Sequence, residues 1–349
     1  MQDFFTKYQI SNDEVIAVGV SGGADSLALA LRLNEQGHKV IALTVDHGLR
    51  PEARAEAEYV ASLMQKFAIE HHILTWIGAK PTNGVEEAAR QARYNLLFDF
   101  CHQHHIKYLA TGHHRRDQAE TFLLRLARGS GVFGLSGILP LSQRDGITII
   151  RPQLDSSPED LKKYLRDLNI KWIEDPMNDQ EDFARVRIRK FLPQLETIGI
   201  TEQRLAETAT TLQSTREYLH RRCDKFINDN VRRFGANIVA LPFNQFIKCE
   251  SEIARLVLGE LIRSIGDNSY QPEAESLQRI ISEGKQFKGC TLGKCEIEIA
   301  SHKLWIIPQD SNNTTMTTAQ WDKFVAEHQE FANSGLPYKV RRAIWQTWK

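Results

Sequence analysis

The chain has 349 residues, with 44 Lys and Arg against 44 Asp and Glu, so its formal net charge at pH 7 is zero. This length predicts two domains with a sizeable core, and the balanced charge neither indicates nor excludes a polyanionic partner. The opening stretch, MQDFFTKYQISNDE, is unlike a signal peptide, and no apolar run approaches the roughly 18 residues of a membrane span. Together with five cysteines in no paired pattern, these features predict a cytoplasmic protein without a membrane anchor.

The first half of the chain alternates apolar runs with helical patterns. Strands are predicted at 14–20, 39–45, 71–77 and 106–112, and helices near 24–36, 52–68 and 85–104. This order is typical of βαβ units and predicts an α/β fold with a doubly wound, mostly parallel sheet. A later helix is predicted with Ser157 as N-cap, Pro158 as its first residue and Asp160 completing a capping box.

The second part of the chain has a different pattern. A long amphipathic helix is predicted over 201–229, and a shorter one from Pro272 with Leu277, Ile280 and Ile281 on one face. Strand-like pieces follow at 286–292, 295–300 and 303–308, before a polar loop or linker at 309–318. We therefore divide the chain into an α/β domain (1–200), a mainly helical domain (201–310) and a linker with a short C-terminal segment (311–349).

The most informative segment is SGGADS, which comprises Ser21, Gly22, Gly23, Ala24, Asp25 and Ser26. Small residues between a strand and a helix let the backbone wrap an anion, and the helix N-terminus supplies free N–H groups. The Lys-Ser/Thr pair of a Walker A loop and the pattern G-x-G-x-x-G are both absent. The loop is thus predicted to hold pyrophosphate as a leaving group, with Asp25 as a Mg²⁺ ligand; the alternative is a tight turn with Asp25 as helix cap. SGGADS resembles the signature of the PP-loop ATP pyrophosphatases, which adenylate an oxygen and expel pyrophosphate.

Further segments narrow the family. They are VDHGLRPEA (45–53), EEAARQARY (86–94), TGHHRRDQAETFLLRLARGSG (111–131), WIEDPMND (172–179) and FARVRIRKFLPQL (183–195). In order and spacing, the chain resembles the bacterial tRNA(Ile)-lysidine synthetases, densely over 14–215. The resemblance implies that ATP activates C2 of cytidine 34 in a tRNA(Ile) with anticodon CAU, and that the ε-amine of free lysine then displaces AMP to give lysidine. Residues 1–200 would do the chemistry and 201–310 would bind the tRNA.

Three motifs fall at predicted strand carboxyl ends, where a doubly wound sheet places its ligands. They are the SGGADS loop, Asp46-His47 and Gly112-His113-His114. The resemblance implies that Asp46 and His47 flank the adenosine and assigns Gly112 and His113 to the nucleotide site. A histidine satisfied within its own loop is the alternative for His47.

Asp117 and Glu120 are three residues apart and share a helix face. Carboxylates suit the ammonium group of lysine, and a buried carboxylate or a histidine could accept the proton that the attacking amine loses. Asp117 is therefore predicted as a catalytic and lysine-binding residue, with Glu120 beside it. The alternative is that acids at a helix start only complement the helix dipole.

Two arginine pairs complete the predicted site. Arg90 and Arg93 lie one turn apart and could neutralise phosphates of ATP or tRNA, with Arg93 placed among the catalytic residues; pairing with Glu86 or Glu87 is the alternative. Arg185 and Arg189 project together and could clamp a tRNA phosphate, unless Arg185 merely pairs with Glu181.

Two positions depart from the family pattern. Many members have GHHxDDQ, where this chain has Arg116 before Asp117, and R-N-x-[IL]-R becomes Arg185-Val186-Arg187-Ile188-Arg189. A non-catalytic tRNA-binding relative and another PP-loop tRNA-modifying enzyme therefore stay as alternatives, although no C-x-x-C supports thiolation. Segments that mix arginines with aromatics, 216–223, 230–234 and 338–342, are generic candidates for RNA contact. The sequence leaves a homodimer open.

Overall fold

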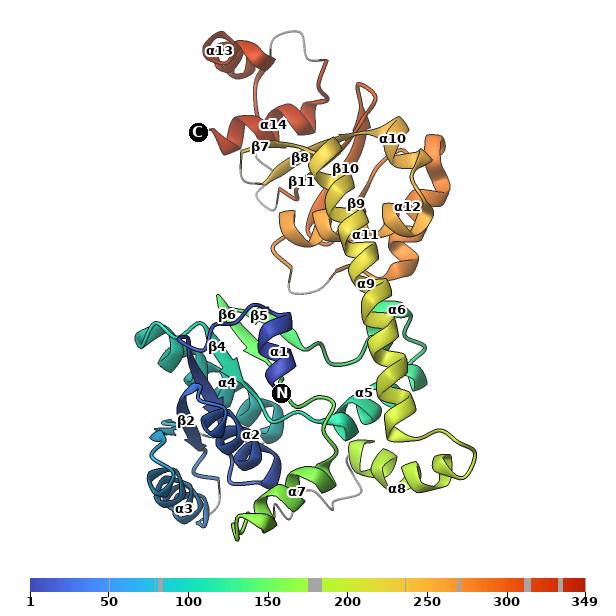
Figure 1. The fold of residues 1–349 in the computed structure, drawn as a ribbon. Coiled ribbons are helices and arrows are strands. Elements are labelled where there is room, and N and C mark those ends of the chain that lie inside the picture. The colour runs from blue at the N-terminus through green and yellow to red at the C-terminus, as the bar shows by residue number, and fades with distance from the viewer. Residues whose placement is uncertain are drawn as a thin grey trace. The chain divides into compact units, whose positions relative to one another are not determined.

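The structure is a computed structural model that describes the chain except residues 50, 79, 81–83, 175–183, 236, 269–270, 311–314, 332–334 and 349, and the side chains of Gln2, Glu86 and Glu330. It divides into two compact units, Met1–Arg216 and Glu217–Lys349, whose boundary lies inside the long helix α9 (Glu202–Asn230) (Figure 1). The predicted boundary at residue 200 thus precedes the structural one, and the described residues after 310 belong to the second unit.

The first unit contains a six-stranded sheet in the order β3-β2-β1-β4-β6-β5. All its neighbouring strands pair in parallel except the edge strand β5, which is antiparallel to β6. The predicted α/β fold with a mostly parallel, doubly wound sheet is therefore confirmed. The strands are β1 (Val15–Gly19), β2 (Lys39–Asp46), β3 (Glu70–Thr75), β4 (Tyr108–Ala110), β5 (Leu141–Arg144) and β6 (Ile147–Ile150).

Alternate residues of the central strand β1 enter two different cores, because successive side chains of a strand point to opposite faces. Ile16 and Val18 pack with Leu27, Val60 and Leu161 from helices on one face. Ala17, between them, packs into the core on the other face, which α4 covers. The helices on the first face are α1 (Gln2–Lys7), α2 (Ala24–Glu35), α3 (Ala53–Lys66) and α7 (Pro158–Asp167), and α4 is Val85–Gln103.

The strand order changes direction at β1. The chain moves outward from β1 to β2 and β3, and then returns to the other side of β1 with β4. The carboxyl ends of β1 and β4 therefore open side by side, which is where open α/β sheets bind ligands. Residues 21–26 follow β1 and residues 111–114 follow β4, so the fold brings these two predicted motifs together.

Three helices extend the first unit beyond the sheet. Ala119 and Phe122 of α5, Leu192 of α8, and Leu205 and Ala209 of α9 share one apolar core. This core fixes α5 against α8, although 56 residues of chain separate the end of α5 from the start of α8. It therefore sets the positions of the charged residues that line the contact. The helix α5 comprises Arg115–Ala127 and α8 comprises Ala184–Glu196. The short helix α6 (Val132–Leu135) follows α5.

The second unit is built on a five-stranded antiparallel sheet, β7-β8-β11-β10-β9, with helices around it. Trp321 and Val340 from its last helices pack on Ile238 and Trp305 of the sheet, so the described part of 311–349 is core material rather than only a linker. The three predicted strand-like pieces form β9, β10 and β11. The elements are β7 (Arg232–Phe234), β8 (Ile238–Pro242), α10 (Phe243–Lys248), α11 (Ser251–Ile265), α12 (Ala274–Glu283), η2 (Gly284–Gln286), β9 (Cys290–Leu292), β10 (Cys295–Ala300), β11 (Lys303–Pro308), α13 (Thr318–Glu327), η3 (Gln329–Phe331) and α14 (Tyr338–Thr347).

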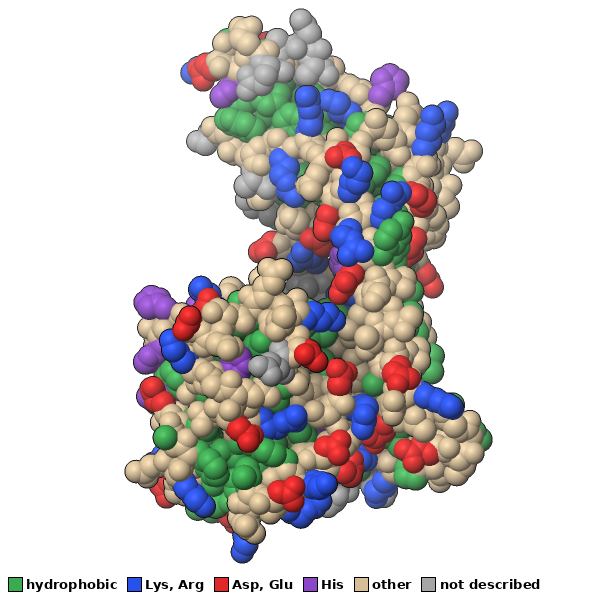
Figure 2. Space-filling model, viewed as in Figure 1, with side chains coloured by type: hydrophobic (Ala, Val, Ile, Leu, Met, Phe, Trp, Pro, Cys, Tyr) green, Lys and Arg blue, Asp and Glu red, His purple; other side chains and the backbone are tan. Residues whose placement is uncertain are grey.

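Basic and acidic side chains are interspersed on the face that Figure 2 shows, in keeping with the balanced composition. Among the described residues, no helix combines the length and apolar character needed to cross a bilayer. The same residues hold five free cysteines and no disulfide.

Candidate active site

The loop after β1 is shaped by its own hydrogen bonds. Ser26 Oγ accepts the Ser21 N–H at 3.1 Å and lies 3.1 Å from the Gly23 carbonyl oxygen, to which it donates. Gly22 has φ of +83°, and a Cβ there would stand 2.5 Å from Ile173 Cδ1, so both conformation and space favour glycine. Gly23 is the N-cap of α2 and provides no side-chain cap. The first N–H groups of α2 are therefore available to an anion.

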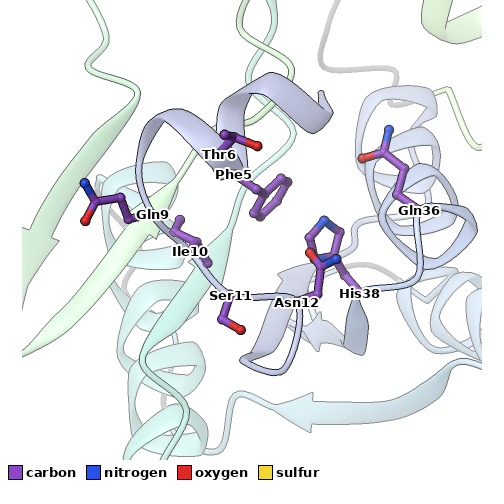
Figure 3. Close-up of a pocket in the computed structure, with 8 residues that line it drawn as sticks. All are labelled: Phe5, Thr6, Gln9, Ile10, Ser11, Asn12, Gln36 and His38. Atoms are coloured by element: carbon purple, nitrogen blue, oxygen red, sulfur yellow. The ribbon is translucent and has the colours of Figure 1, made fainter.

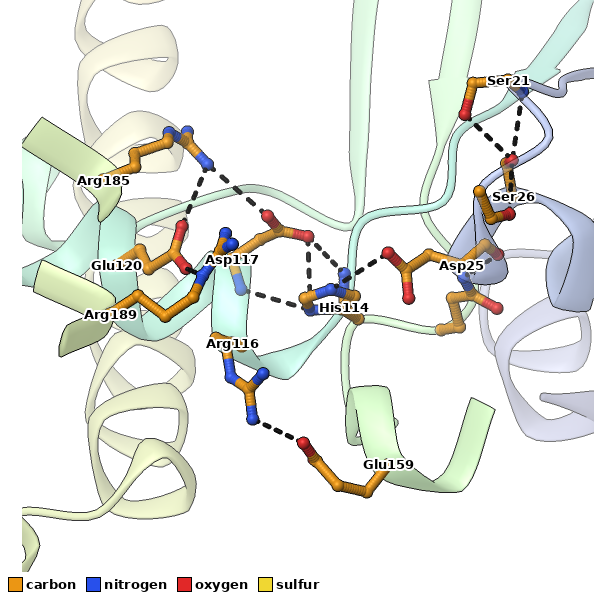
Figure 4. A network of polar contacts seen from close by, with 12 residues as sticks. Ser21, Asp25, Ser26, His114, Arg116, Asp117, Glu120, Glu159, Arg185 and Arg189 are labelled. Carbon is orange, nitrogen blue, oxygen red and sulfur yellow. Dashed lines mark hydrogen bonds and ion pairs between the residues drawn. The ribbon is translucent and has the colours of Figure 1, made fainter. Parts of the chain in front are cut away.

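Asp25 lies in the first turn of α2 and is not the helix cap, because that position is Gly23. Its Oδ2 is 3.4 Å from His114 Nε2, while its Oδ1 is buried and has no hydrogen-bond partner among the described residues (Figure 4). Gln153 Nε2 donates to the Asp25 carbonyl oxygen at 2.8 Å and ties the loop to the segment after β6. An unpartnered carboxylate oxygen beside free helix N–H groups suits a cation that accompanies a phosphate.

His114 connects this loop to α5. It is the N-cap of α5 and forms a reciprocal capping box with Asp117: its Nδ1 accepts the Asp117 N–H at 3.3 Å, and its own N–H donates to Asp117 Oδ2 at 2.9 Å. Because Nδ1 accepts, the ring proton lies on Nε2, facing Asp25. Burial acts to lower the pKa of His114, but its hydrogen bond to Asp25 and the nearby carboxylates outweigh this and raise that pKa.

The two predicted charged pairs, one on α5 and one on α8, form a single cluster (Figure 4). Arg189 Nε lies 3.0 Å from Glu120 Oε1, and Arg185 Nη1 lies 3.5 Å from Asp117 Oδ1 and 3.7 Å from Glu120 Oε2. Glu120 is fully buried, and this burial raises the pKa of its carboxyl group, although Arg189 opposes the effect. Sequence spacing could not predict that the two pairs face each other, because they lie on helices that are distant in the chain. Glu181, the predicted alternative partner of Arg185, lies outside the described residues.

Asp46 is the last residue of β2, and His47 follows it at the carboxyl end of the strand. The buried Asp46 accepts the Gly48 N–H through Oδ1 at 2.9 Å, which closes a local turn. The His47 ring lies edge-on to Trp76 at 6.2 Å, and its Nδ1 is buried without a partner among the described residues. Burial, followed by the charges of Arg93 and Lys80, lowers the pKa of His47. The neutral ring therefore keeps an unused polar atom, and the prediction of an adenosine contact stays a prediction.

Arg90 and Arg93 contact the same ring, with their guanidinium carbons 5.4 and 5.6 Å from the Tyr94 centroid. No carboxylate in the described part of the chain lies within ion-pair distance of either arginine; the Glu86 side chain is outside that part. Burial lowers the pKa of Arg93. Burial also lowers the pKa of His113 to about 4, and its Nδ1 is 2.9 Å from Thr111 Oγ1. The two arginines supply positive charge without a carboxylate partner among the described residues, which suits an anion, while the His113 ring is neutral at pH 7.

The departures from the family pattern have structural explanations. Arg116 turns away from Asp117 (Figure 4) and lies 2.5 Å from Glu202 Oε1 of α9 and 2.7 Å from Glu159 Oε1 of α7. The two carboxylates compensate its charge, so Arg116 links three helices instead of reversing the charge of the site. Val186 is buried, where an apolar side chain is suitable.

A pocket of the first unit lies away from the predicted site. A pocket of about 350 Å³ lies between α1 and the turn from α2 to β2 (Figure 3). It is at the amino-terminal edge of the parallel strands, opposite the SGGADS loop, and no predicted site residue lines it. Its lining is Phe5, Thr6, Gln9, Ile10, Ser11, Asn12, Gln36 and His38.

Other sequence-based candidates receive less support. Within the described residues, no group of three or more His, Cys, Asp or Glu side chains is arranged to hold a metal ion. In the segment 338–342, Lys339 lies 2.9 Å from Glu298 and Arg342 lies 3.2 Å from Glu296. These basic groups are engaged within the second unit. The motif at 172–179 falls largely on residues that are not described.

Comparison with known proteins defines the class of the fold. A PP-loop domain model matches residues 1–196, and the fold is similar to that of a U34-tRNA thiolase from Methanococcus maripaludis, with a TM-score of 0.52 and 19% identity over 60% of this chain and 77% of that one. The fold and the loop together define a PP-loop ATP-binding protein.

Curated relatives specify the family. Proteins named tRNA(Ile)-lysidine synthase are 35% identical in Wolbachia pipientis (88% of this chain, 75% of that protein) and 37% identical in Hyphomonas neptunium (85% and 82%). A third, from Methylobacterium nodulans, is 36% identical over 84% of this chain and 90% of its own length. This chain belongs to the tRNA(Ile)-lysidine synthase family, as the sequence resemblance predicted.

Proposed function

We propose that this protein is an ATP-dependent ligase that joins free lysine to cytidine 34 of a tRNA(Ile) with anticodon CAU. In the first step, O2 of the cytidine attacks the α-phosphorus of ATP and pyrophosphate leaves. In the second, the lysine ε-nitrogen attacks C2, loses a proton, and AMP leaves with the former O2. The proposal includes a cytoplasmic location. It does not require a homodimer, because all the groups assigned below come from one chain.

The SGGADS loop is assigned to the departing pyrophosphate. The uncapped N–H groups of α2 would bind its oxygens, and the unpartnered Asp25 Oδ1 would be a ligand of Mg²⁺. A bound Mg²⁺ would neutralise charge on the phosphates and take most of its other ligands from ATP and water. The absence of a larger ligand cluster among the described residues fits that division. Arg90, Arg93 and His113 would face the remaining anionic groups.

Asp117 is assigned to the lysine amine. One of its oxygens is fixed by the His114 N–H at 2.9 Å, and the other faces Arg185, whose side chain is 46% exposed and free to give way to an ammonium group. Glu120 is held at 3.0 Å by Arg189 in a fully buried position, which suits positioning better than substrate contact. The proton of the attacking amine would pass to the Asp117 carboxylate.

One observation carries the proposal: an uncapped helix N-terminus and a buried, unpartnered carboxylate oxygen lie together at the end of β1. A protein that only binds tRNA does not need this arrangement, so a non-catalytic relative is the less favoured function. A thiolase-like function is also less favoured, because this chain contains no C-x-x-C pair.

The test compares Asp25→Asn with Asp13→Asn, which makes the same change at a side chain that is 93% exposed in the same unit. Nucleoside mass spectrometry after incubation of tRNA with ATP and labelled lysine should detect lysidine with the wild type and Asp13→Asn. Asp25→Asn should lose tRNA-dependent pyrophosphate release from ATP and still bind tRNA. Lysidine formation at a normal rate by Asp25→Asn would contradict the assignment of the loop, and no lysidine with the wild type would contradict the function.

A further inference from the structure

Two arginines bind α6 and the short turn that follows it. Arg125 of α5 donates from Nη1 to the carbonyl oxygens of Gly134 at 2.7 Å and Gly137 at 2.9 Å. Arg216 of α9 donates from Nη1 to the Phe133 carbonyl oxygen and to Ser136 Oγ, both at 3.3 Å. These bonds fix two guanidinium groups on one turn, and each group keeps further N–H donors for another acceptor.

Among the described residues, this Arg125–Arg216 pair faces no neutralising carboxylate. In the described part of the chain, no carboxylate lies within ion-pair distance of either guanidinium, whereas Arg185 and Arg189 both face carboxylates. Burial and then the charge of Arg185 lower the pKa of Arg125, and burial and then the charge of Arg125 lower that of Arg216. Two half-buried like charges without counter-ions are unfavourable in isolation, and a bound anion would relieve their repulsion.

The position of the pair relates it to the predicted site. Asp117, Thr121 and Arg125 are spaced by four residues and form one stripe along α5. At 1.5 Å per residue, Arg125 lies about 12 Å along the helix axis from Asp117. Arg185 Nη2 reaches Thr121 Oγ1 at 3.4 Å, between the two. An anion bound by the pair is therefore separate from the ATP phosphates at the SGGADS loop. An RNA chain whose reacting base lies beside Asp117 is long enough to place a phosphate there.

We propose that Arg125 and Arg216 form a phosphate-contact surface for the RNA substrate, one or a few nucleotides from the modified base. This inference rests on the proposed function. RNA is the fitting partner because its phosphates recur along the chain, so one substrate can present a base to Asp117 and a phosphate to the pair. The contact is electrostatic and independent of base identity.

The test uses a fluorescently labelled transcript of a tRNA with anticodon CAU, titrated by anisotropy over a series of KCl concentrations. Arg216→Gln should weaken binding about 3- to 10-fold and reduce the slope of log Kd against log salt by about 0.7 to 0.9, the change for one lost phosphate contact. Arg216→Lys keeps the charge and should keep the slope. Arg204→Gln is the matched control, because Arg204 also lies on α9 and donates to a backbone carbonyl, that of Gly199, at 2.6 Å.

The outcomes separate this inference from the proposed function. If Arg216→Gln keeps the wild-type slope, or if Arg216→Lys loses as much slope as Arg216→Gln, charge at the pair does not bind RNA and the inference is wrong. Thermal melting of each variant shows whether lost binding follows lost folding. Arg125→Gln and Arg125→Lys repeat the comparison at the other arginine of the pair. If the wild type binds the transcript but makes no lysidine, the proposed function fails while the RNA contact stands.

Discussion

Gly112 and Ser26 are in contact through their backbones. A Cβ atom on Gly112 would stand 3.0 Å from the Ser26 nitrogen and 3.1 Å from the Asp25 carbonyl carbon. The segment that follows β4 therefore runs directly against the first turn of α2. This approach brings His114 to Asp25 and joins the phosphate loop to the acidic end of α5.

Gly112→Ala should displace the SGGADS loop, because the atoms that the new methyl group meets are backbone atoms that cannot rotate away. We expect a loss of about 1–3 kcal/mol in the free energy of unfolding and a larger proportional loss of ATP-dependent pyrophosphate release. Gly131→Ala is the control: an added Cβ there meets no atom within 4 Å, and its stability should stay within about 0.5 kcal/mol of wild type. Normal pyrophosphate release by Gly112→Ala would show that the close approach is unimportant for the site.

Arg189→Gln should leave Glu120 with only the more distant Arg185 as a charged partner. Because Glu120 is fully buried, we expect a loss of about 1–3 kcal/mol in the free energy of unfolding. Burial already raises the pKa of Glu120, so protonation at acid pH should reduce the deficit, and the variant should differ from wild type most at neutral pH. The double variant Glu120→Gln/Arg189→Gln should recover part of the loss in chemical denaturation; strictly additive losses would mean that the two side chains do not interact.

Arg116 and Glu202 should show strong coupling in a double-mutant cycle of Arg116→Gln and Glu202→Gln. Their side chains are 26% and 16% exposed, and we expect a coupling free energy of about 1–2 kcal/mol. The exposed pair Arg54 and Glu58, treated in the same way, should give no more than about 0.5 kcal/mol. Similar coupling free energies in the two cycles would show that Arg116 does not stabilise the contact of α5 with α7 and α9 more than an exposed ion pair would.

His71 should make the fold sensitive to acid. Burial lowers its pKa in the folded chain from 6.5 to about 4, and it bonds Thr44 Oγ1 at 2.9 Å. Between these two values only the unfolded chain takes up the proton, so the free energy of unfolding falls as pH falls through this window. Between pH 7 and pH 4, the free energy of unfolding of His71→Gln should fall by about 1–2 kcal/mol less than that of the wild type. This difference allows for the partial exposure of the ring, which weakens the effect. The exposed His102→Gln should follow the wild-type profile, and a His71→Gln profile parallel to wild type would exclude this linkage.

Much of the first unit could be predicted because its signals are local. The strands and helices of the first half, the Ser157 cap, whose Oγ accepts the Asp160 N–H at 3.1 Å, and the long helix α9 all follow from side-chain spacing. The helix predicted from Pro272 begins two residues later, at Ala274, with Glu273 as its N-cap. Pro272 therefore precedes the helix and is not its first residue. The roles assigned to the individual site residues stay predictions.

The sequence by itself determined the doubly wound sheet, the anion-binding loop after its first strand and the family, because these depend on residues that are neighbours in the chain. Only the tertiary structure decided that Arg185 and Arg189 face Asp117 and Glu120, and that Arg116 is compensated by Glu159 and Glu202. It also decided that Arg125 and Arg216 bind one short segment with no carboxylate of the described residues within ion-pair distance. These relationships join helices that are distant in sequence, and their geometry is set by how the apolar faces of α5, α8 and α9 pack, which no local spacing encodes.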